Sequence, residues 1–130
     1  MSTISQHAVR AHSDAVRLPT DELVTRLRDL LGARLVAYIG HVSETRAVRQ
    51  WADGTRQPAS APLGRLRVAY QVAALLAETD SPTTIQVWFQ GMNPHLNDES
   101  PARLLRTGDL DTVGPAVIDA ARAFATTSSS

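Results

Sequence analysis

The side chains best suited to a binding role lie just before and within a helical pattern that ends in tryptophan. Val48 and Trp51 are three residues apart and are expected to face inward. The outward positions carry side chains that can reach base edges: Thr45, Arg46, Arg49 and Gln50. Arg56 follows this helix and has the chemistry to hold a phosphate. The segment is therefore predicted to bind DNA, although arginines on a helix face are commonly only solvated.

No set of residues has the pattern of a catalytic or metal site. The histidines are scattered, and none pairs at the i, i+4 spacing of a helical metal site: His7, His12, His41 and His95. The chain has no cysteine, which excludes disulfides and thiolate ligands, and it has no glycine-rich phosphate loop. The sequence therefore predicts a protein that is not an enzyme and that uses no metal and no cofactor.

The charge of the chain is zero overall but unevenly placed. Residues 1–67 contain ten Arg against six acidic residues, a charge of +4, and residues 68–130 contain three Arg against seven, a charge of −4. Such asymmetry indicates different partners for the two halves. The chain contains Arg but no Lys. Arg binds phosphate and guanine in a bidentate way. The codon bias of a GC-rich genome would also favour Arg over Lys.

The elements that must position these side chains are all expected to be helices. Leu23, Leu27 and Leu31 predict a helix with Thr20 as its N-cap and Gly32 at its end. A short helix with Leu35, Val36 and Ile39 inward should follow, and the turn Gly40-His41-Val42 should end it. Ser43 is the expected cap of the third helix, and Gly54 its stop.

The second half of the chain predicts a long central helix and a small helical module. The long helix should run from Pro62 to about Thr79, and its second half is apolar on nearly every side, as in a buried spine or a dimer contact. Ser81-Pro82 and Ser100-Pro101 each open a shorter helix. A last helix should be capped by Asp109 or Asp111, with Pro115 in its first turn and an inward stripe formed by Val113, Val117, Ala121 and Phe124. No strand is expected, so the fold class is all-α.

The exit of the third helix, with Trp51, Gly54 and Pro58 at fixed spacing, resembles the Xre/Cro family of helix-turn-helix domains. The family's third helix lies in the major groove, which agrees with the outward polar residues. The turn Gly40-His41-Val42-Ser43 is one residue longer than the family's usual Gly-Val-Ser. Helix-turn-helix modules also serve as packing units or protein-binding surfaces, so this alternative remains open.

A second motif resembles the toxin-binding domain of the Xre/MbcA/ParS antitoxins. Its residues occur in the family's order: Trp88, Asn93-Pro94, Leu96, Pro101, Leu104-Leu105, Gly108, Val113 and Phe124. The two resemblances in series cover about residues 20–125. They divide the chain into a flexible arm (1–18, with a transient turn of helix around Ala8–Val16), an Xre-like domain with the central helix (19–80), a toxin-binding domain (81–125) and a flexible tail (126–130).

This resemblance implies a type II antitoxin. Its partner would be a RES-fold toxin that consumes NAD. The antitoxin would inhibit this toxin by covering the entrance through which NAD reaches its active site. The antitoxin would also bind its own operator DNA and repress the operon, as a homodimer or within a larger toxin–antitoxin assembly. The acidic second half fits a partner with a basic cleft. Polar residues of the loop, the last helix and the tail are the candidate toxin contacts: Asn93, His95, Asn97, Asp98, Glu99, Arg122, Thr126 and Thr127.

Two other functions remain open at this stage. The chain could be a stand-alone helix-turn-helix regulator whose second half only mediates dimerisation, or a helical adaptor without a DNA role. An adjacent gene for a RES-like protein would favour the antitoxin. No apolar run is long enough to span a membrane and no signal-peptide pattern occurs at the N-terminus, so a cytoplasmic location is expected.

Overall fold

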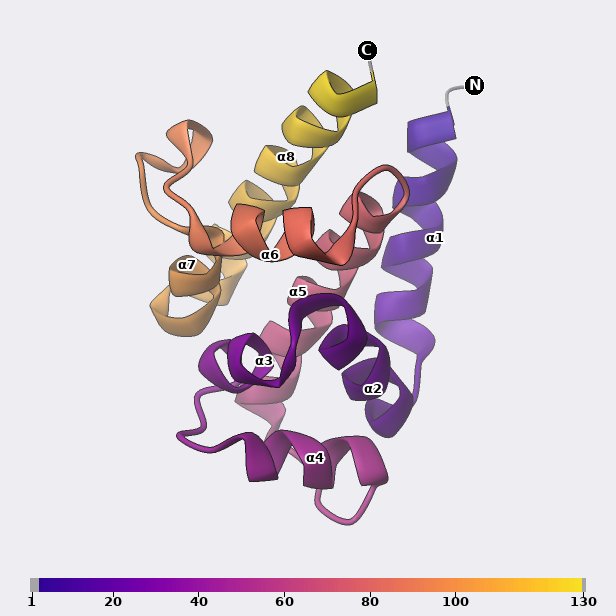
Figure 1. Ribbon diagram of the computed structural model, residues 1–130, viewed down its shortest axis with the longest axis vertical. Helices are drawn as coiled ribbons and strands as arrows, with labels where there is room; N and C mark the ends of the chain where they lie inside the picture. The colour runs from indigo at the N-terminus through magenta and orange to yellow at the C-terminus, as the bar shows by residue number, and fades with distance from the viewer. Residues whose placement is uncertain (1–2, 130) are drawn as a thin grey trace.

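The computed structural model describes the backbone of residues 3–129, and this part of the chain is helical without a strand (Figure 1). The predicted all-α class is therefore confirmed. In chain order the elements are α1 (Thr3–Arg17), α2 (Thr20–Leu31), α3 (Ala33–Ile39), α4 (Thr45–Asp53), α5 (Ser60–Ala77), α6 (Pro82–Gln90), the 3-10 helix η1 (Pro94–Leu96), α7 (Pro101–Thr107) and α8 (Leu110–Ser129).

The central helix α5 is the spine of the molecule. It runs along the length of the fold between α1 and α8 (Figure 1) and packs against α1, α2, α3, α6, α7 and α8. Leu66, Ala69, Val72 and Leu76 are completely buried in it, which explains why its second half is apolar on nearly every side. The buried side chains form one continuous cluster from α1 to α8. Helices α2 to α4 and the C-terminal helices therefore share a core.

Both chain ends differ from the expected flexible arm and tail. Residues 3–17 form α1, which docks on α5 through the buried Ala11 and Ala15. The guanidinium of Arg67 donates to the main-chain carbonyls of Ala15 at 2.8 Å and Leu18 at 3.2 Å, so the end of α1 is held. At the other end, α8 continues as a helix through residue 129. Residues 1, 2 and 130 of the expected arm and tail lie outside the described residues.

Two expected helix caps are shifted by one residue, two are confirmed, and one proline lies a turn later in its helix than expected. Pro19, not Thr20, is the N-cap of α2, and Glu44, not Ser43, is the N-cap of α4; neither side chain accepts a capping hydrogen bond. Pro115 is the sixth residue of α8, so it lies in the second turn and cannot donate to the carbonyl of Asp111. The predicted caps of α6 and α7 are present, because the hydroxyls of Ser81 and Ser100 each accept a main-chain N–H.

Candidate functional site

The predicted recognition helix α4 is fixed by its inward side. Ala47, Val48 and Trp51 are buried, and α4 packs against α2 and α3. Five residues separate α3 from α4, and His41 takes the left-handed conformation with a φ of 62°. This conformation lets the chain change direction within the longer turn, and α4 packs against both α2 and α3.

The outward side of α4 carries side chains that are free to contact a ligand. Thr45, Arg46 and Arg49 are exposed, and Gln50 is half-buried. Among the described residues, Arg46 and Arg49 have no hydrogen-bond or ion-pair partner for their guanidinium groups. Arg46, Gln50 and Arg56 line one depression of about 480 Å³, together with His41 and Ser43. The structure thus brings most of the predicted DNA-binding residues onto one surface.

The chain after α4 is ordered by hydrogen bonds to a single carbonyl. Gly54 has a φ of 78°, which is the left-handed conformation that ends many helices. The main-chain carbonyl of Gln50 accepts the N–H groups of Thr55 at 3.0 Å and Arg56 at 3.2 Å. It also accepts the hydroxyl of Thr55 at 3.3 Å. This cap sets Arg56 beside α4, and it gives the Trp-x-x-Gly sequence a structural role.

Several other arginines of the basic half are used inside the fold. Arg65 donates to the carbonyl of Leu105 at 2.6 Å, and Arg67 donates to the end of α1. Arg26 pairs with Glu22 at 2.8 Å. Hydrogen bonds to Tyr70 and then to Glu22 raise the pKa of Arg26 further above its ordinary value. The charge of +4 therefore overstates what this half offers to DNA.

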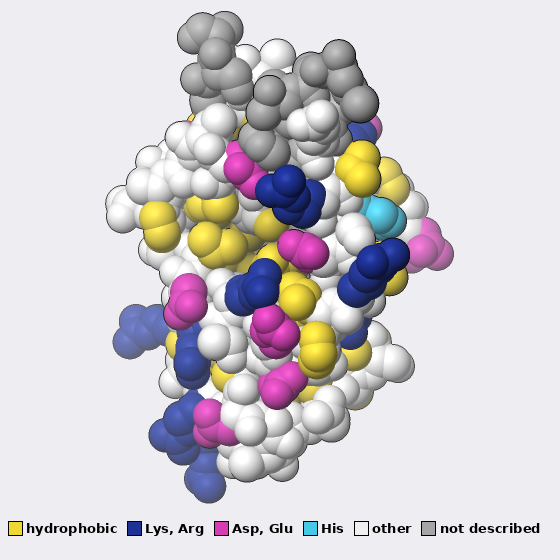
Figure 2. Space-filling view, turned by 90° about the vertical axis from the view of Figure 1, so that its right-hand side faces the viewer, with side chains coloured by type: hydrophobic (Ala, Val, Ile, Leu, Met, Phe, Trp, Pro, Cys, Tyr) yellow, Lys and Arg dark blue, Asp and Glu magenta, His cyan; other side chains and the backbone are white. Residues whose placement is uncertain are grey.

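Several basic side chains lie together at the end of the molecule that carries α4, and others are spread over the rest of the face (Figure 2). Figure 2 shows Arg side chains protruding together along the lower edge, at the end where Figure 1 places α4. Across the middle of the same face, basic and acidic side chains alternate (Figure 2). A polyanion is therefore attracted to the α4 end and not to the middle of this face.

Sequence reasoning missed a second basic depression beside α4. It has about 730 Å³ and is lined by residues of α3, α4, the turn between them and α7, among them Arg34, Tyr38, Arg46 and Arg106. The guanidinium carbon of Arg106 lies 4.6 Å from the centroid of the Tyr38 ring. Arg106 lies in the acidic half of the chain, and no local pattern connects it with Tyr38. Only the i, i+4 spacing of Arg34 and Tyr38 on an outward helix face could have drawn attention to this site.

The loop between α6 and α7 is built around Asn93, which was predicted as a toxin contact. Asn93 is 8% exposed, and its side-chain oxygen accepts the N–H of His95 at 2.9 Å. Its main-chain carbonyl accepts the N–H groups of Leu96 and Asp98, both at 2.9 Å, and its own N–H donates to the carbonyl of Glu99 at 3.2 Å. The prediction for Asn93 is therefore corrected: its side chain is turned inward and organises the loop.

The remaining predicted contacts fall into two groups. His95, Asn97 and Asp98 are exposed on the loop, and Glu99 is half-buried and pairs with Arg103 at 3.7 Å. A second group lies along α8 and consists of Arg122, Thr126 and Thr127. The threonine hydroxyls of this group donate to main-chain carbonyls one turn earlier.

Arg122 lies on the side of α8 that faces away from α6. Phe124 faces Trp88 of α6, with ring centroids 6.3 Å apart. Arg122 precedes Phe124 by two residues, which places the two about 200° apart around the helix. Arg122 accordingly lines a small hollow between α1, α5 and α8 with Ala8 and Gln71. The loop and this side of α8 are thus separate candidate surfaces.

Two apolar side chains next to the loop are exposed to solvent. Val87, near the end of α6, is 67% exposed, and Met92, which follows α6, is 81% exposed. The carbonyl of Val87 accepts the N–H of Gly91 at 2.9 Å. This hydrogen bond closes the end of α6, and the loop begins immediately after it. Single exposed apolar side chains are common on protein surfaces, so these two are candidate partner contacts only in combination with the loop.

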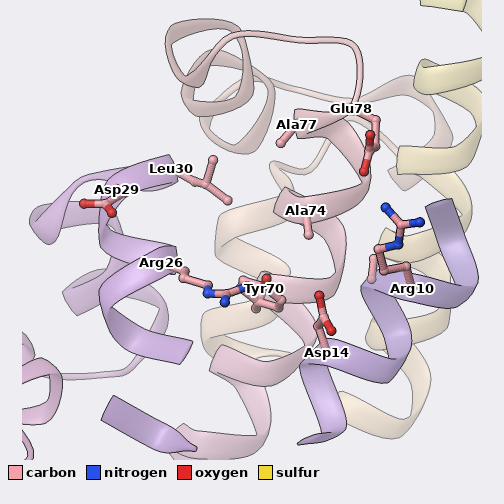
Figure 3. A pocket seen from close by; sticks show the side chains of 10 residues that line it. Arg10, Asp14, Arg26, Asp29, Leu30, Tyr70, Ala74, Ala77 and Glu78 are labelled. Atoms are coloured by element: carbon pink, nitrogen blue, oxygen red, sulfur yellow. The ribbon is translucent and has the colours of Figure 1, made fainter. Parts of the chain in front are cut away.

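A further cavity of about 340 Å³ lies between α1, α2 and α5. Figure 3 shows Arg26 reaching from α2 toward Tyr70, while Arg10 and Asp14 come from α1. Charges of both signs line it, and Arg26 is already satisfied by Tyr70 and Glu22. Within the described part of the chain, no three His, Cys, Asp or Glu residues come close enough to bind a metal ion. The described residues that line this cavity therefore indicate no particular reaction.

Comparisons with protein-family models, curated proteins and solved structures give no match for the chain. Among the described residues, no helix combines the length and the apolar character that crossing a bilayer requires.

Proposed function

We propose that this protein is an antitoxin that binds operator DNA through α4 and a RES-fold toxin through its C-terminal helices. The observation that carries the DNA part is the state of Arg46 and Arg49. Both are exposed on a helix that Val48 and Trp51 hold in place, and neither is paired with another described residue. Two unpaired guanidinium groups on a braced helix have the chemistry to read guanine and to bind phosphate.

In this proposal α4 enters the major groove and α3 supports it from behind. Thr45, Arg46, Arg49 and Gln50 meet base edges, and Arg56 meets a phosphate. Bidentate contacts from arginine discriminate between bases, whereas the phosphate contact sets the register. Occupation of the operator by the protein would repress transcription of its own operon.

The toxin part rests on the sequence resemblance and gains support from the surface around the loop. His95, Asn97 and Asp98 project from a loop that Asn93 holds in one conformation, and Val87 and Met92 add apolar area beside it. A loop that is already ordered loses little entropy on binding. An acidic side chain such as that of Asp98 suits the basic pocket in which a toxin would hold the pyrophosphate of NAD.

The exposed Val87 and Met92 also favour a second candidate function. They could instead form a contact between two copies of a stand-alone DNA-binding regulator. The two functions differ in what covers these side chains. Light scattering of the purified protein, alone and with the product of an adjacent RES-like gene, separates them: a stable homodimer that gains no toxin supports the regulator, and a heteromeric complex supports the antitoxin.

A separation-of-function experiment tests the proposal in cells. Arg46→Ala with Arg49→Ala should release a reporter placed behind the operon's promoter while cells still survive expression of the toxin. Arg10→Ala with Arg17→Ala is the matched control, because both arginines are exposed on α1, outside the proposed DNA-binding and toxin-binding surfaces. Continued repression by the α4 double variant would rule out α4 as the recognition helix, and death of cells expressing toxin with the wild-type protein would rule out the antitoxin.

A further inference from the structure

The second basic depression joins the helix-turn-helix to the C-terminal half of the chain. Three arginines line it, Arg34 from α3, Arg46 from α4 and Arg106 from α7, against one acidic residue, Glu44. Ser43 and Thr45 add hydroxyl groups at its edge. An anion that accepts hydrogen bonds is the ligand class that this lining matches.

Arg106 is held in place before any ligand arrives. Its guanidinium stacks on the ring of Tyr38, 4.6 Å from the centroid, and one of its NH groups donates to the carbonyl of Tyr38 at 2.6 Å. The stack uses the face of the guanidinium, and the carbonyl uses one of its five N–H donors. The other donors remain for a ligand, and the fixed side chain loses little freedom on binding.

Arg34 supplies a second cation from the same side of α3. It precedes Tyr38 by one helical turn, so the two side chains share a face of the helix. Arg34 is exposed, and its guanidinium has no partner among the described residues. The depression thus combines a fixed arginine from the C-terminal half with a free arginine from the helix-turn-helix.

We infer that this depression receives the DNA phosphate backbone that borders the major groove occupied by α4, with Arg34 and Arg106 as its phosphate contacts. The inference rests on the proposed DNA binding and extends it to the C-terminal half. A helix fills the major groove, so residues packed beside the recognition helix face the bordering strand. Arg46 lines both depressions next to α4, which places the second depression directly at that border.

The experiment measures binding of the full-length protein to a fluorescent duplex taken from immediately upstream of its coding sequence, over a series of salt concentrations. Arg34→Gln and Arg106→Gln should each weaken binding about three- to tenfold and lower the slope of log K against log salt by about 1. Arg106→Lys should keep most of the salt slope because it keeps the charge. Arg103→Gln, on the same helix but outside the depression, is the control and should bind like the wild type.

The outcomes separate this inference from the function on which it rests. If Arg34→Gln and Arg106→Gln retain the wild-type affinity and salt slope while Arg46→Ala with Arg49→Ala abolishes binding, the phosphate assignment is wrong and the DNA function stands. If the wild-type protein binds no duplex, both are wrong. Arg34→Gln keeps the test largely independent of folding, because Arg34 is exposed and its guanidinium has no hydrogen-bond or ion-pair partner among the described residues. Circular dichroism of Arg106→Gln shows whether loss of the Tyr38 stack disturbs α7.

Discussion

Gly40 lies directly against the ring of Trp51, with no room for a side chain between them. A Cβ at Gly40 would lie 3.0 Å from Cζ3 of Trp51 and 3.2 Å from the carbonyl oxygen of Val36. Trp51 is 2% exposed, and its indole N–H has no hydrogen-bond partner within the described chain. Trp51 therefore contributes through packing and not through a hydrogen bond: its ring fills the space between the end of α3 and α4.

Gly40→Ala should destabilise the protein and disturb the placement of α4. The added methyl must displace a buried ring or main chain, which typically costs about 1–3 kcal/mol in the free energy of unfolding. Chemical denaturation measures this cost. Gly64→Ala, in helix α5, is the matched control. Its added Cβ would meet only the side chain of Leu110 in α8, at 3.4 Å. It should be neutral or gain about 0.5–1 kcal/mol. Equal stability of the two variants would contradict the packing of Trp51 on Gly40.

Asn93→Ala should loosen the loop between α6 and α7 without unfolding the molecule. The variant loses the side-chain acceptor of the His95 N–H, a capping interaction worth about 1 kcal/mol. Amide hydrogen exchange of residues 95–99 should accelerate, and binding of the toxin should weaken with it. Asn97→Gly is the control for the exchange measurement alone, because Asn97 has a φ of 55° that glycine adopts easily and is itself a proposed toxin contact. Unchanged exchange in Asn93→Ala would mean that Asn93 does not organise the loop.

Arg67→Leu should free the end of α1 while leaving the rest of the core in place. The substitution keeps an apolar side chain at this position of α5 but removes the donor for the carbonyls of Ala15 and Leu18. Helix ends without such donors fray, so limited proteolysis should cut sooner near residues 15–19. Arg17→Leu removes an exposed arginine from the same helix end and should not change the cleavage rate. Equal cleavage of the two variants would show that Arg67 does not hold α1.

Val87→Ser with Met92→Ser should weaken binding of a protein partner without changing stability. Both side chains are mostly exposed, so their loss removes little buried area from the fold. In calorimetric titration with the RES-like toxin, affinity should fall, because apolar area at an interface contributes to binding. Val9→Ser with Val16→Ser is the control, since these valines are 70% and 62% exposed on α1. If only the control variant lost affinity, the partner-binding surface would lie on α1 and not beside the loop.

Helix positions and most of the core could be predicted from the sequence, because they depend on local signals. Ser81, Ser100 and Gly54 mark helix ends through their own conformations, and Val48 and Trp51 follow the helical period. The docking of α1 could not be predicted in this way. Its buried contact residues include Ala11 and Ala15, which are small and only weakly apolar, and its end is held by Arg67 from another helix.

The same limit applies to the candidate sites: residues carried by one helix can be predicted from the sequence, but contacts between distant segments cannot. The outward residues of α4 could be predicted because one helix positions all of them. Asn93 looked like a surface residue because asparagine is commonly exposed, and only the folded loop turns its side chain inward. Arg106 and Tyr38 meet across 68 positions of sequence, where no pattern in a single chain connects two residues.

The most direct test of the account is the affinity of the full-length protein for the duplex upstream of its own coding sequence. Fluorescence anisotropy of the wild type and of Arg46→Ala with Arg49→Ala measures this affinity at matched salt. We expect binding by the wild type, preferred over a duplex of scrambled sequence, and a loss of about tenfold or more in the double variant. Equal affinity of the two proteins, or no preference of the wild type for the upstream duplex, would contradict the claim that α4 reads DNA.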